Sequence, residues 1–154
     1  MNKKTVNKIP PNSIEAEEAV IGAVLLKGND IFVKCDGWIR DSDAFYNDKT
    51  KVIWESCSEM PRNGEAIDVV TVSQNLKDMF YLTGLPEKVP TTANVEHYAR
   101  IIWEKFIKRE SIKSAYKLYN TSLDKQDEKA ENLLQEHARL INELMEIAPS
   151  KKRE

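Results

Sequence analysis

The 154-residue sequence contains few of the residues that make turns, with only five glycines and six prolines. An all-β chain of this length needs a turn about every 8–12 residues, so this scarcity favours helices. Apolar residues make up 41% of the sequence and charged residues 31%. That balance supplies a core and suits a helical protein with solvated faces. We therefore predict an all-α chain of one domain, with or without a small appended element.

Cysteine and histidine are scarce. Cys35 and Cys57 lack the spacing of a metal or redox site, and His97 and His137 are the only histidines. Secreted disulfide frameworks use more cysteines in a chain of this size. We expect both thiols to be reduced, the chain to be cytoplasmic, and both histidines to be ordinary surface or helix-seam residues. The sequence predicts no metal and no cofactor.

Long hydrophobic stretches are also missing. The charged start at residues 1–5 is not followed by the apolar stretch of a signal peptide. The longest apolar run, residues 19–26, is far shorter than the roughly 20 residues that cross a bilayer. We expect no membrane association.

No motif of a catalytic site is present. The glycines at positions 22, 28, 37, 64 and 84 form neither a phosphate-binding loop nor a dinucleotide-binding motif. Glu15, Glu17 and Glu18 form the one dense carboxylate group near the N-terminus. We interpret them as favourable charge in a first helical turn rather than as an acid–base or metal cluster. The chain is predicted to have no catalytic residue and no ATPase activity.

The formal net charge of −2 gives no basic surplus, whereas domains that grip a phosphate backbone usually carry one. Lys105, Lys108, Arg109 and Lys113 do cluster, and we interpret them as a solvated helix face. We therefore expect no direct contact with nucleic acid. A DNA-binding helical protein remains the third alternative, and its binding would weaken steeply with salt.

Four segments follow one another along the chain. Residues 1–11 are polar and end in two prolines, which predicts a flexible N-terminal arm. Residues 12–90 alternate short apolar stretches with turn residues, which predicts a globular subdomain of about four to six helices. Residues 91–148 are expected to form a helical hairpin, and residues 149–154 a tail or the start of a linker.

Three helix starts in the globular segment can be proposed from capping residues. Asn12 is expected to cap the first helix and Asp48 a helix over residues 49–60. Asp68 is expected to cap a further helix whose apolar face runs from Val69 to Phe80.

The last third of the chain has a different pattern. Apolar residues recur every three or four positions from Val95 to Tyr119, without glycine or proline, which predicts a helix over residues 92–120. A polar turn and a second periodic stretch from Ala130 to Ile147 follow. Two long helices joined by a short turn form an antiparallel hairpin.

The hairpin has more apolar residues than a seam between two helices can cover. A second hairpin or a partner protein is the expected cover, with packing inside the chain as the alternative. The residues expected to make these contacts are Tyr116, Tyr119, Leu123, Leu133 and Leu134.

Several short segments stand in a recognisable order over residues 9–115. They are PPNSIEAE at 10–17, AVIGAVLL at 19–26, FY at 45–46, GEAIDVVTV at 64–72, PTTANVEHYARII at 90–102 and RE at 109–110. Together they resemble the N-terminal domain of DnaB-type replicative DNA helicases. Two departures stand out: residues 49–51 lack the histidine that this family usually has there, and residues 81–86 lack its GG-x-x-YL segment, which leaves the small fifth helix open.

The resemblance implies a scaffold role in DNA replication. In that family the hairpins pair, so self-association as a dimer, or as a hexamer built as a trimer of dimers, is expected. It also implies docking of the C-terminal domain of primase, and a helicase loader is a further possible partner. ATP hydrolysis would belong to a domain beyond Glu154. The alternative is a stand-alone helicase- or primase-binding regulator of phage or mobile-element origin, and the sequence leaves open whether the chain is an excised domain or a complete product.

Overall fold

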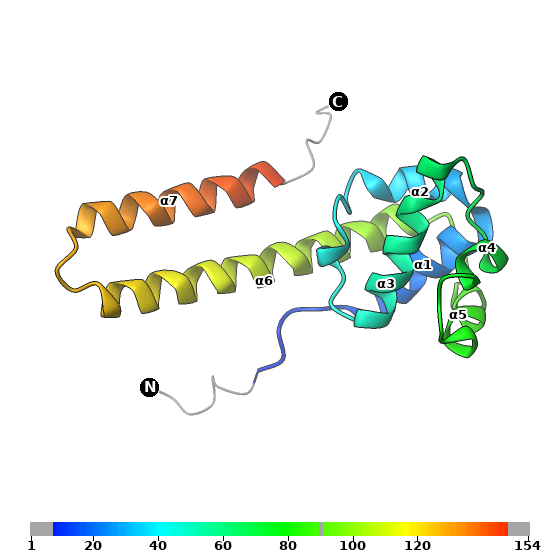
Figure 1. The fold of residues 1–154 in the computed structure, drawn as a ribbon, viewed down its shortest axis with the longest axis horizontal. Coiled ribbons are helices and arrows are strands. Elements are labelled where there is room, and N and C mark those ends of the chain that lie inside the picture. The colour runs from blue at the N-terminus through cyan, green and yellow to red at the C-terminus, as the bar shows by residue number, and fades with distance from the viewer. Residues whose placement is uncertain (1–7, 90, 148–154) are drawn as a thin grey trace. The chain divides into compact units, whose positions relative to one another are not determined.

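A computed structural model describes residues 8–89 and 91–147, and every regular element in these ranges is a helix (Figure 1). The all-α prediction is confirmed. Most of the predicted arm, residues 1–7, and the predicted tail lie outside the described residues. The chain forms two compact units, one of Asn12–Phe106 and one of Met1–Pro11 with Ile107–Glu154. Each unit is described separately.

Helix α1 (Ile14–Lys27) forms the centre of the Asn12–Phe106 unit, and its residues are buried almost without interruption from Ala16 to Leu25. A helix that is apolar all round belongs inside a bundle. Ser13 caps it, since the side chain accepts a hydrogen bond from the Ala16 N–H at 3.2 Å. The prediction of Asn12 as the cap was wrong by one residue.

Short helices follow α1. In chain order these helices are α2 (Asn29–Asp36), η2 (Ser42–Ala44), α3 (Asp48–Glu59), η3 (Pro61–Asn63), α4 (Val69–Ser73), α5 (Met79–Gly84) and η4 (Pro86–Lys88). Among them α2, α3 and η4 pack against α1. Helix α3 is capped by Asn47, because the Asn47 side chain accepts a hydrogen bond from the Lys49 N–H at 2.9 Å. The predicted cap, Asp48, is the first residue of the helix.

Aromatic side chains fill the space between α2 and α3. The Trp54 ring stacks on Phe32 with centroids 4.8 Å apart and lies 5.3 Å from Phe45. Phe45 is buried, whereas its neighbour Tyr46 is exposed. One aromatic of the FY pair therefore anchors the loop before α3.

The segment after Asp68 differs from its prediction. Asp68 does cap α4, and its carboxylate accepts from the Thr71 N–H at 2.8 Å. The helix ends at Ser73, however, and α5 begins anew with Asp78 as its cap. Phe80 therefore does not share an apolar face with Val69. Its side chain is 92% exposed.

Two long helices follow, α6 (Val95–Asp124) and α7 (Ala130–Ile147). Both predicted helices are confirmed, although α6 begins and ends a few residues later than expected. Within the second unit α7 runs back along α6, which gives the predicted antiparallel hairpin (Figure 1). The predicted division at residues 90 and 91 precedes α6, whereas the compact units divide inside α6 after Phe106. The predicted domain boundaries remain predictions.

Among the helices of residues 8–89 and 91–147, none has both the length and the apolar character needed to cross a bilayer.

Candidate functional site

One side of the outer part of α6 presents large apolar side chains to water. Ile112, Tyr116, Tyr119 and Leu123 are 43%, 62%, 51% and 52% exposed. Their spacing of four, three and four residues places them on one side of the helix, and we call them the α6 face. By the same periodicity Ser114, which is buried, lies on the opposite side.

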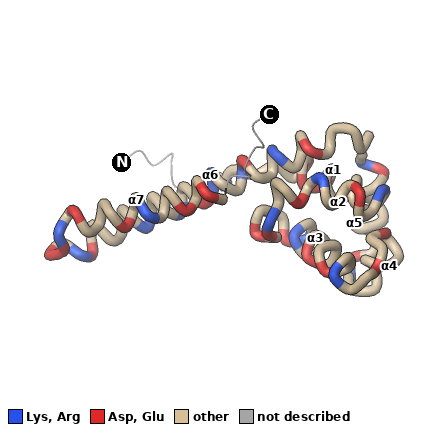
Figure 2. The backbone as a smooth tube through the Cα atoms, turned by 90° about the horizontal axis from the view of Figure 1, so that it is seen from above, with Lys and Arg blue, Asp and Glu red and all other residues tan. Residues whose placement is uncertain are grey.

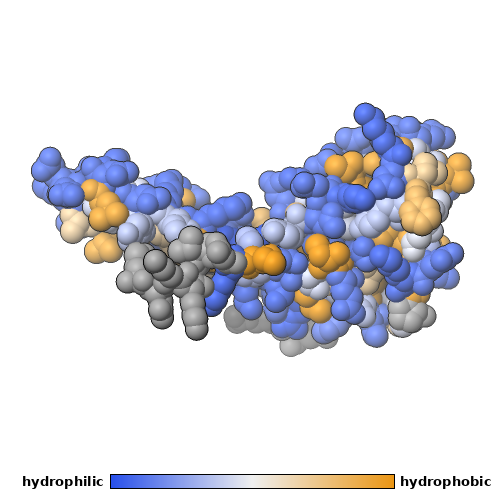
Figure 3. All heavy atoms as spheres, turned by 90° about the horizontal axis from the view of Figure 1, so that it is seen from below, coloured by the Kyte–Doolittle hydropathy of each residue, from blue (hydrophilic) through white to orange (hydrophobic). Residues whose placement is uncertain are grey.

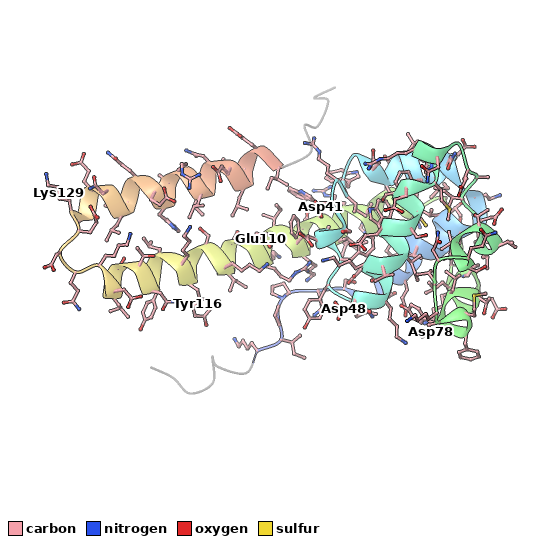
Figure 4. The ribbon with its side chains drawn as sticks, in the orientation of Figure 1. Asp41, Asp48, Asp78, Glu110, Tyr116 and Lys129 are labelled. Atoms are coloured by element: carbon pink, nitrogen blue, oxygen red, sulfur yellow. The ribbon has the colours of Figure 1, made fainter. Side chains whose placement is uncertain are left out.

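A shallow, open groove lies on the α6 face. Its lining is almost entirely apolar and consists of Ile112, Ala115, Tyr116 and Tyr119. Tyr116 projects from the side of α6 that is turned away from α7 (Figure 4). In the space-filling view the hairpin shows apolar patches bordered by hydrophilic surface (Figure 3). Nothing within this chain's described residues covers the groove.

Helix α7 carries a second exposed apolar stripe. Leu134 and Met145 are 63% and 68% exposed, Ala138 is exposed and Ile141 is half-buried. These four residues, which we call the α7 face, again follow a spacing of four, three and four. No residue of α7 is fully buried, so this strongly patterned helix leaves much of its apolar surface in water.

The seam between the two helices is small and partly polar. Leu118 and Thr121 of α6 and Leu133, His137 and Leu140 of α7 line a narrow space there. Among the described residues, His137 Nδ1 and Ser114 Oγ of α6 are buried and have no hydrogen-bond partner. An unpaired buried polar atom costs about 1–3 kcal/mol. Such atoms lower the stability that the seam gives the hairpin, and a cover on its exposed faces would add stability.

The five residues predicted for contacts thus fall into three places. Tyr116, Tyr119 and Leu123 lie together on the α6 face, and Leu134 lies on the α7 face. Leu133 is half-buried in the seam, so the structure separates it from the others. Their role in contacts stays a prediction. Ile112 and Met145 were not among the predicted contact residues, although the same three- and four-residue spacing includes them.

The predicted first-turn carboxylates have more specific roles than charge alone. Glu17 is buried, and its Oε1 accepts from the Tyr46 N–H at 2.8 Å, the Asn47 N–H at 3.1 Å and the Thr50 hydroxyl at 2.9 Å. One carboxylate oxygen therefore fixes the loop after Phe45 and the first turn of α3 against α1. Glu17 does lie in the first turn of α1, as predicted, but its burial and its three hydrogen bonds were not predicted.

Glu18 connects α1 to a different part of the same unit. Its Oε1 accepts from the Tyr81 hydroxyl at 3.1 Å, and its Oε2 pairs with Lys88 Nζ at 2.7 Å. Burial, with the charge of Glu18 next, raises the pKa of Tyr81 above its usual range. Both carboxylates therefore organise the fold. Within residues 8–89 and 91–147, no group of three metal-binding side chains comes together.

The chain is similar to known proteins. The family described as "DnaB-like helicase N terminal domain" matches residues 9–104, more than half of the chain. The chain belongs to this family. Curated relatives include the replicative DNA helicase DnaC of Bacillus subtilis (strain 168), which is 34% identical, and the replicative DNA helicase DnaB of Geobacillus stearothermophilus, which is 35% identical. Each similarity covers 94% of this chain and 33% of the relative, so the chain spans about a third of their length.

Solved structures show the same fold. The N-terminal domain of the DnaB helicase from Mycobacterium tuberculosis has a TM-score of 0.78 and 24% identity, covering 87% of this chain and 99% of that one. A DnaB-like replicative helicase, studied with its interactions with primase, has a TM-score of 0.68 and 22% identity. That similarity covers 91% of this chain and 32% of the helicase.

The basic cluster of this DnaB-like domain is partly engaged within the chain. Arg109 Nη1 donates to the carbonyl oxygen of Pro11 at 2.9 Å, and Lys113 pairs with Glu110 at 2.8 Å. Acidic and basic residues are interspersed along the hairpin (Figure 2). On α7, hydrogen bonding to Arg139 lowers the pKa of Glu136. This mixture of signs gives little support to a nucleic-acid surface.

The two thiols of the domain give a direct test of its core. Cys35 and Cys57 are free and fully buried, and burial raises the pKa of each to about 12. Because the thiolate is the reactive form, a thiol-specific chromophoric reagent at pH 8 is expected to label neither in the folded chain and both in urea. Rapid labelling without denaturant would contradict this burial.

Proposed function

We propose that this chain is a non-catalytic scaffold domain of a replicative helicase, which self-associates through its hairpin and docks primase. The observation that supports this most directly is the α6 face, four large apolar side chains in water on the side of the helix away from the seam. Contiguous exposed apolar surface of this kind marks interaction sites.

The energy of covering the α6 face is comparable to the cost of assembly. Its four side chains are already about half covered, so covering each one completely is worth about 1 kcal/mol. A symmetric pair covers this face twice, and the sum is of the same order as the roughly 4–15 kcal/mol that association costs. Hairpin pairing therefore accounts for the exposed faces better than packing inside one chain does.

Family membership supports the remainder of the proposal. The curated relatives are replicative helicases, and one similar structure is described with its interactions with primase. We infer dimers that assemble into a hexamer as a trimer of dimers, with the C-terminal domain of primase bound to that assembly. A helicase loader is a second possible partner. ATP-driven unwinding would belong to the part of the relatives that this chain does not span.

Self-association is tested by placing a charge on each exposed face. Tyr116→Glu and Leu134→Glu are each expected to weaken assembly at least about tenfold, because a buried unpaired charge costs more than about 1.4 kcal/mol. Light scattering after size exclusion, over a concentration series, measures this. Leu133→Glu is unsuitable, since Leu133 lies in the seam.

The matched control is Val33→Glu, which changes an exposed apolar residue (70%) on α2 of the other unit. It is expected to leave assembly unchanged. A wild-type chain that stays monomeric up to about 100 μM would contradict the scaffold proposal. That limit corresponds to an association free energy no more favourable than about −5.5 kcal/mol. Primase docking is tested separately, by calorimetric titration with the C-terminal domain of primase, and no binding at that concentration would reject it.

A further inference from the structure

Arg109 ties the predicted N-terminal arm to the hairpin. Its Nη1 donates to the carbonyl oxygen of Pro11 at 2.9 Å, and Met1–Pro11 belong to the same compact unit as the outer part of α6. In the view of Figure 4 the described end of the arm, residues 8–11, lies on the side of α6 that Tyr116 faces, away from α7. The arm is therefore anchored within one helical turn of Ile112, the first residue of the α6 face.

The arm brings its own apolar side chains to this anchor. Ile9 is 75% exposed, more than any other large apolar side chain described in this unit. Ile9 and Pro10 each precede a proline, which favours extended backbone at both positions. Extended backbone of the polyproline type repeats every three residues. Val6 stands three residues before Ile9, so a backbone that continues in this form points both side chains to the same side.

The spacing of these side chains matches the spacing of the α6 face. Polyproline-type backbone advances about 3.1 Å per residue and an α-helix about 1.5 Å, so one arm residue spans about two helix residues. Counted from the anchoring hydrogen bond towards the hairpin turn, Ile9 comes level with Ile112, and Val6 with Tyr119. Both side chains therefore reach the groove, whose lining is almost entirely apolar.

Charge favours this direction of the arm. Lys3 and Lys4 precede Val6, and the same count brings them level with the turn between α6 and α7. Residues 124–128 there include three exposed carboxylates, those of Asp124, Asp127 and Glu128, and one lysine. The part of α6 nearer to the anchor carries Lys108 and Lys113. Exposed ion pairs add little affinity, but lysines of the arm are attracted at the turn and repelled at the anchor.

We propose that residues 3–9 dock on the α6 face of their own chain, with Ile9 and Val6 in the groove, and compete with a second hairpin for that face. The inference rests on the proposed self-association and names its regulation. A second hairpin covers more apolar surface than the arm does, so it displaces the arm as the protein concentration rises. The arm weakens the apparent affinity of self-association in proportion to the fraction of chains whose face it covers.

Disulfide trapping within one chain tests the docking directly. Val6→Cys is combined with Tyr119→Cys and oxidised mildly at low concentration, with the native thiols silent because they are buried. The matched control combines Val6→Cys with Lys117→Cys, an exposed position at a similar height but about 160° around α6 from Tyr119. A docked arm holds the first pair of thiols at high effective concentration. Its intramolecular link is expected about tenfold above that of the control. Equal yields, or links formed only between chains, overturn the proposal.

Self-association, followed by sedimentation velocity, provides the second measurement. Ile9→Ser is expected to tighten it about tenfold, which corresponds to a face covered in about nine of ten chains. The matched control Val33→Ser removes an exposed apolar side chain (70%) from α2 of the other unit and is expected to change nothing. Weaker or unchanged association of Ile9→Ser overturns the competition and leaves hairpin pairing standing. If wild type and Ile9→Ser both stay monomeric, self-association is rejected, and an intramolecular link above the control still supports the docking.

Discussion

Glu17→Ala is expected to lower the free energy of unfolding of the Asn12–Phe106 unit by about 3–5 kcal/mol. The carboxylate is buried, and its removal leaves the N–H groups of Tyr46 and Asn47 and the Thr50 hydroxyl without their acceptor. Urea unfolding followed by tryptophan fluorescence measures this, because all three tryptophans lie in that unit.

The controls separate this network from simple helix charge. Glu15→Ala removes an exposed carboxylate from the same helical turn and is expected to change stability by no more than about 0.5 kcal/mol. Glu17→Gln keeps an acceptor oxygen but loses the charge, so its loss of stability is expected to lie between those of Glu15→Ala and Glu17→Ala. A Glu17→Ala variant as stable as Glu15→Ala would show that the three donors find other partners.

Gly22→Ala is expected to cost about 2–4 kcal/mol, although alanine is the better helix former by about 1 kcal/mol. A methyl group at position 22 would lie 2.5 Å from the Leu85 carbonyl oxygen and 2.5 Å from Val89 Cγ2. The Leu85 atom belongs to the backbone, so α1 must move away from the η4 segment. Thermal unfolding by circular dichroism measures the loss.

Gly37→Ala is the matched control for position 22. Gly37 has ordinary helical angles, φ −62° and ψ −29°, and a methyl group there meets no atom within 4 Å. It is expected to be neutral or to stabilise the chain by up to about 1 kcal/mol. If Gly22→Ala unfolds at the same temperature as Gly37→Ala, α1 and η4 can separate at little cost in free energy.

Periodicity alone predicted the long helices well. Apolar residues three or four positions apart gave α6 and α7 nearly at their observed bounds, because an uninterrupted amphipathic pattern has few other solutions. The short helices were harder. Single-residue errors in capping at Asn12 and Asp48, and the separation of α4 from α5, arose because several neighbouring residues can serve as a cap.

The candidate contact surface was only partly predictable. The same periodicity argument selected Tyr116 and Tyr119 on α6 and Leu133 on α7. A sequence shows that a helix has an apolar side, but it does not show which part of that side a neighbour covers. Only the packing of α7 on α6 placed Leu133 in the seam and Leu134 outside it. Phe80 was assigned to an apolar face that does not exist, since Ser73 ends α4 early.

The sequence by itself determined the all-helical class, the hairpin and the family, because these depend on local spacing and on motifs in fixed order. The tertiary structure alone decided that Glu17 is a buried acceptor for a loop 29 residues away and that Phe80 and the α6 face stay in water. The physical reason is the same for both. Burial and hydrogen bonding join residues distant in the chain, and no local pattern specifies which distant partner arrives.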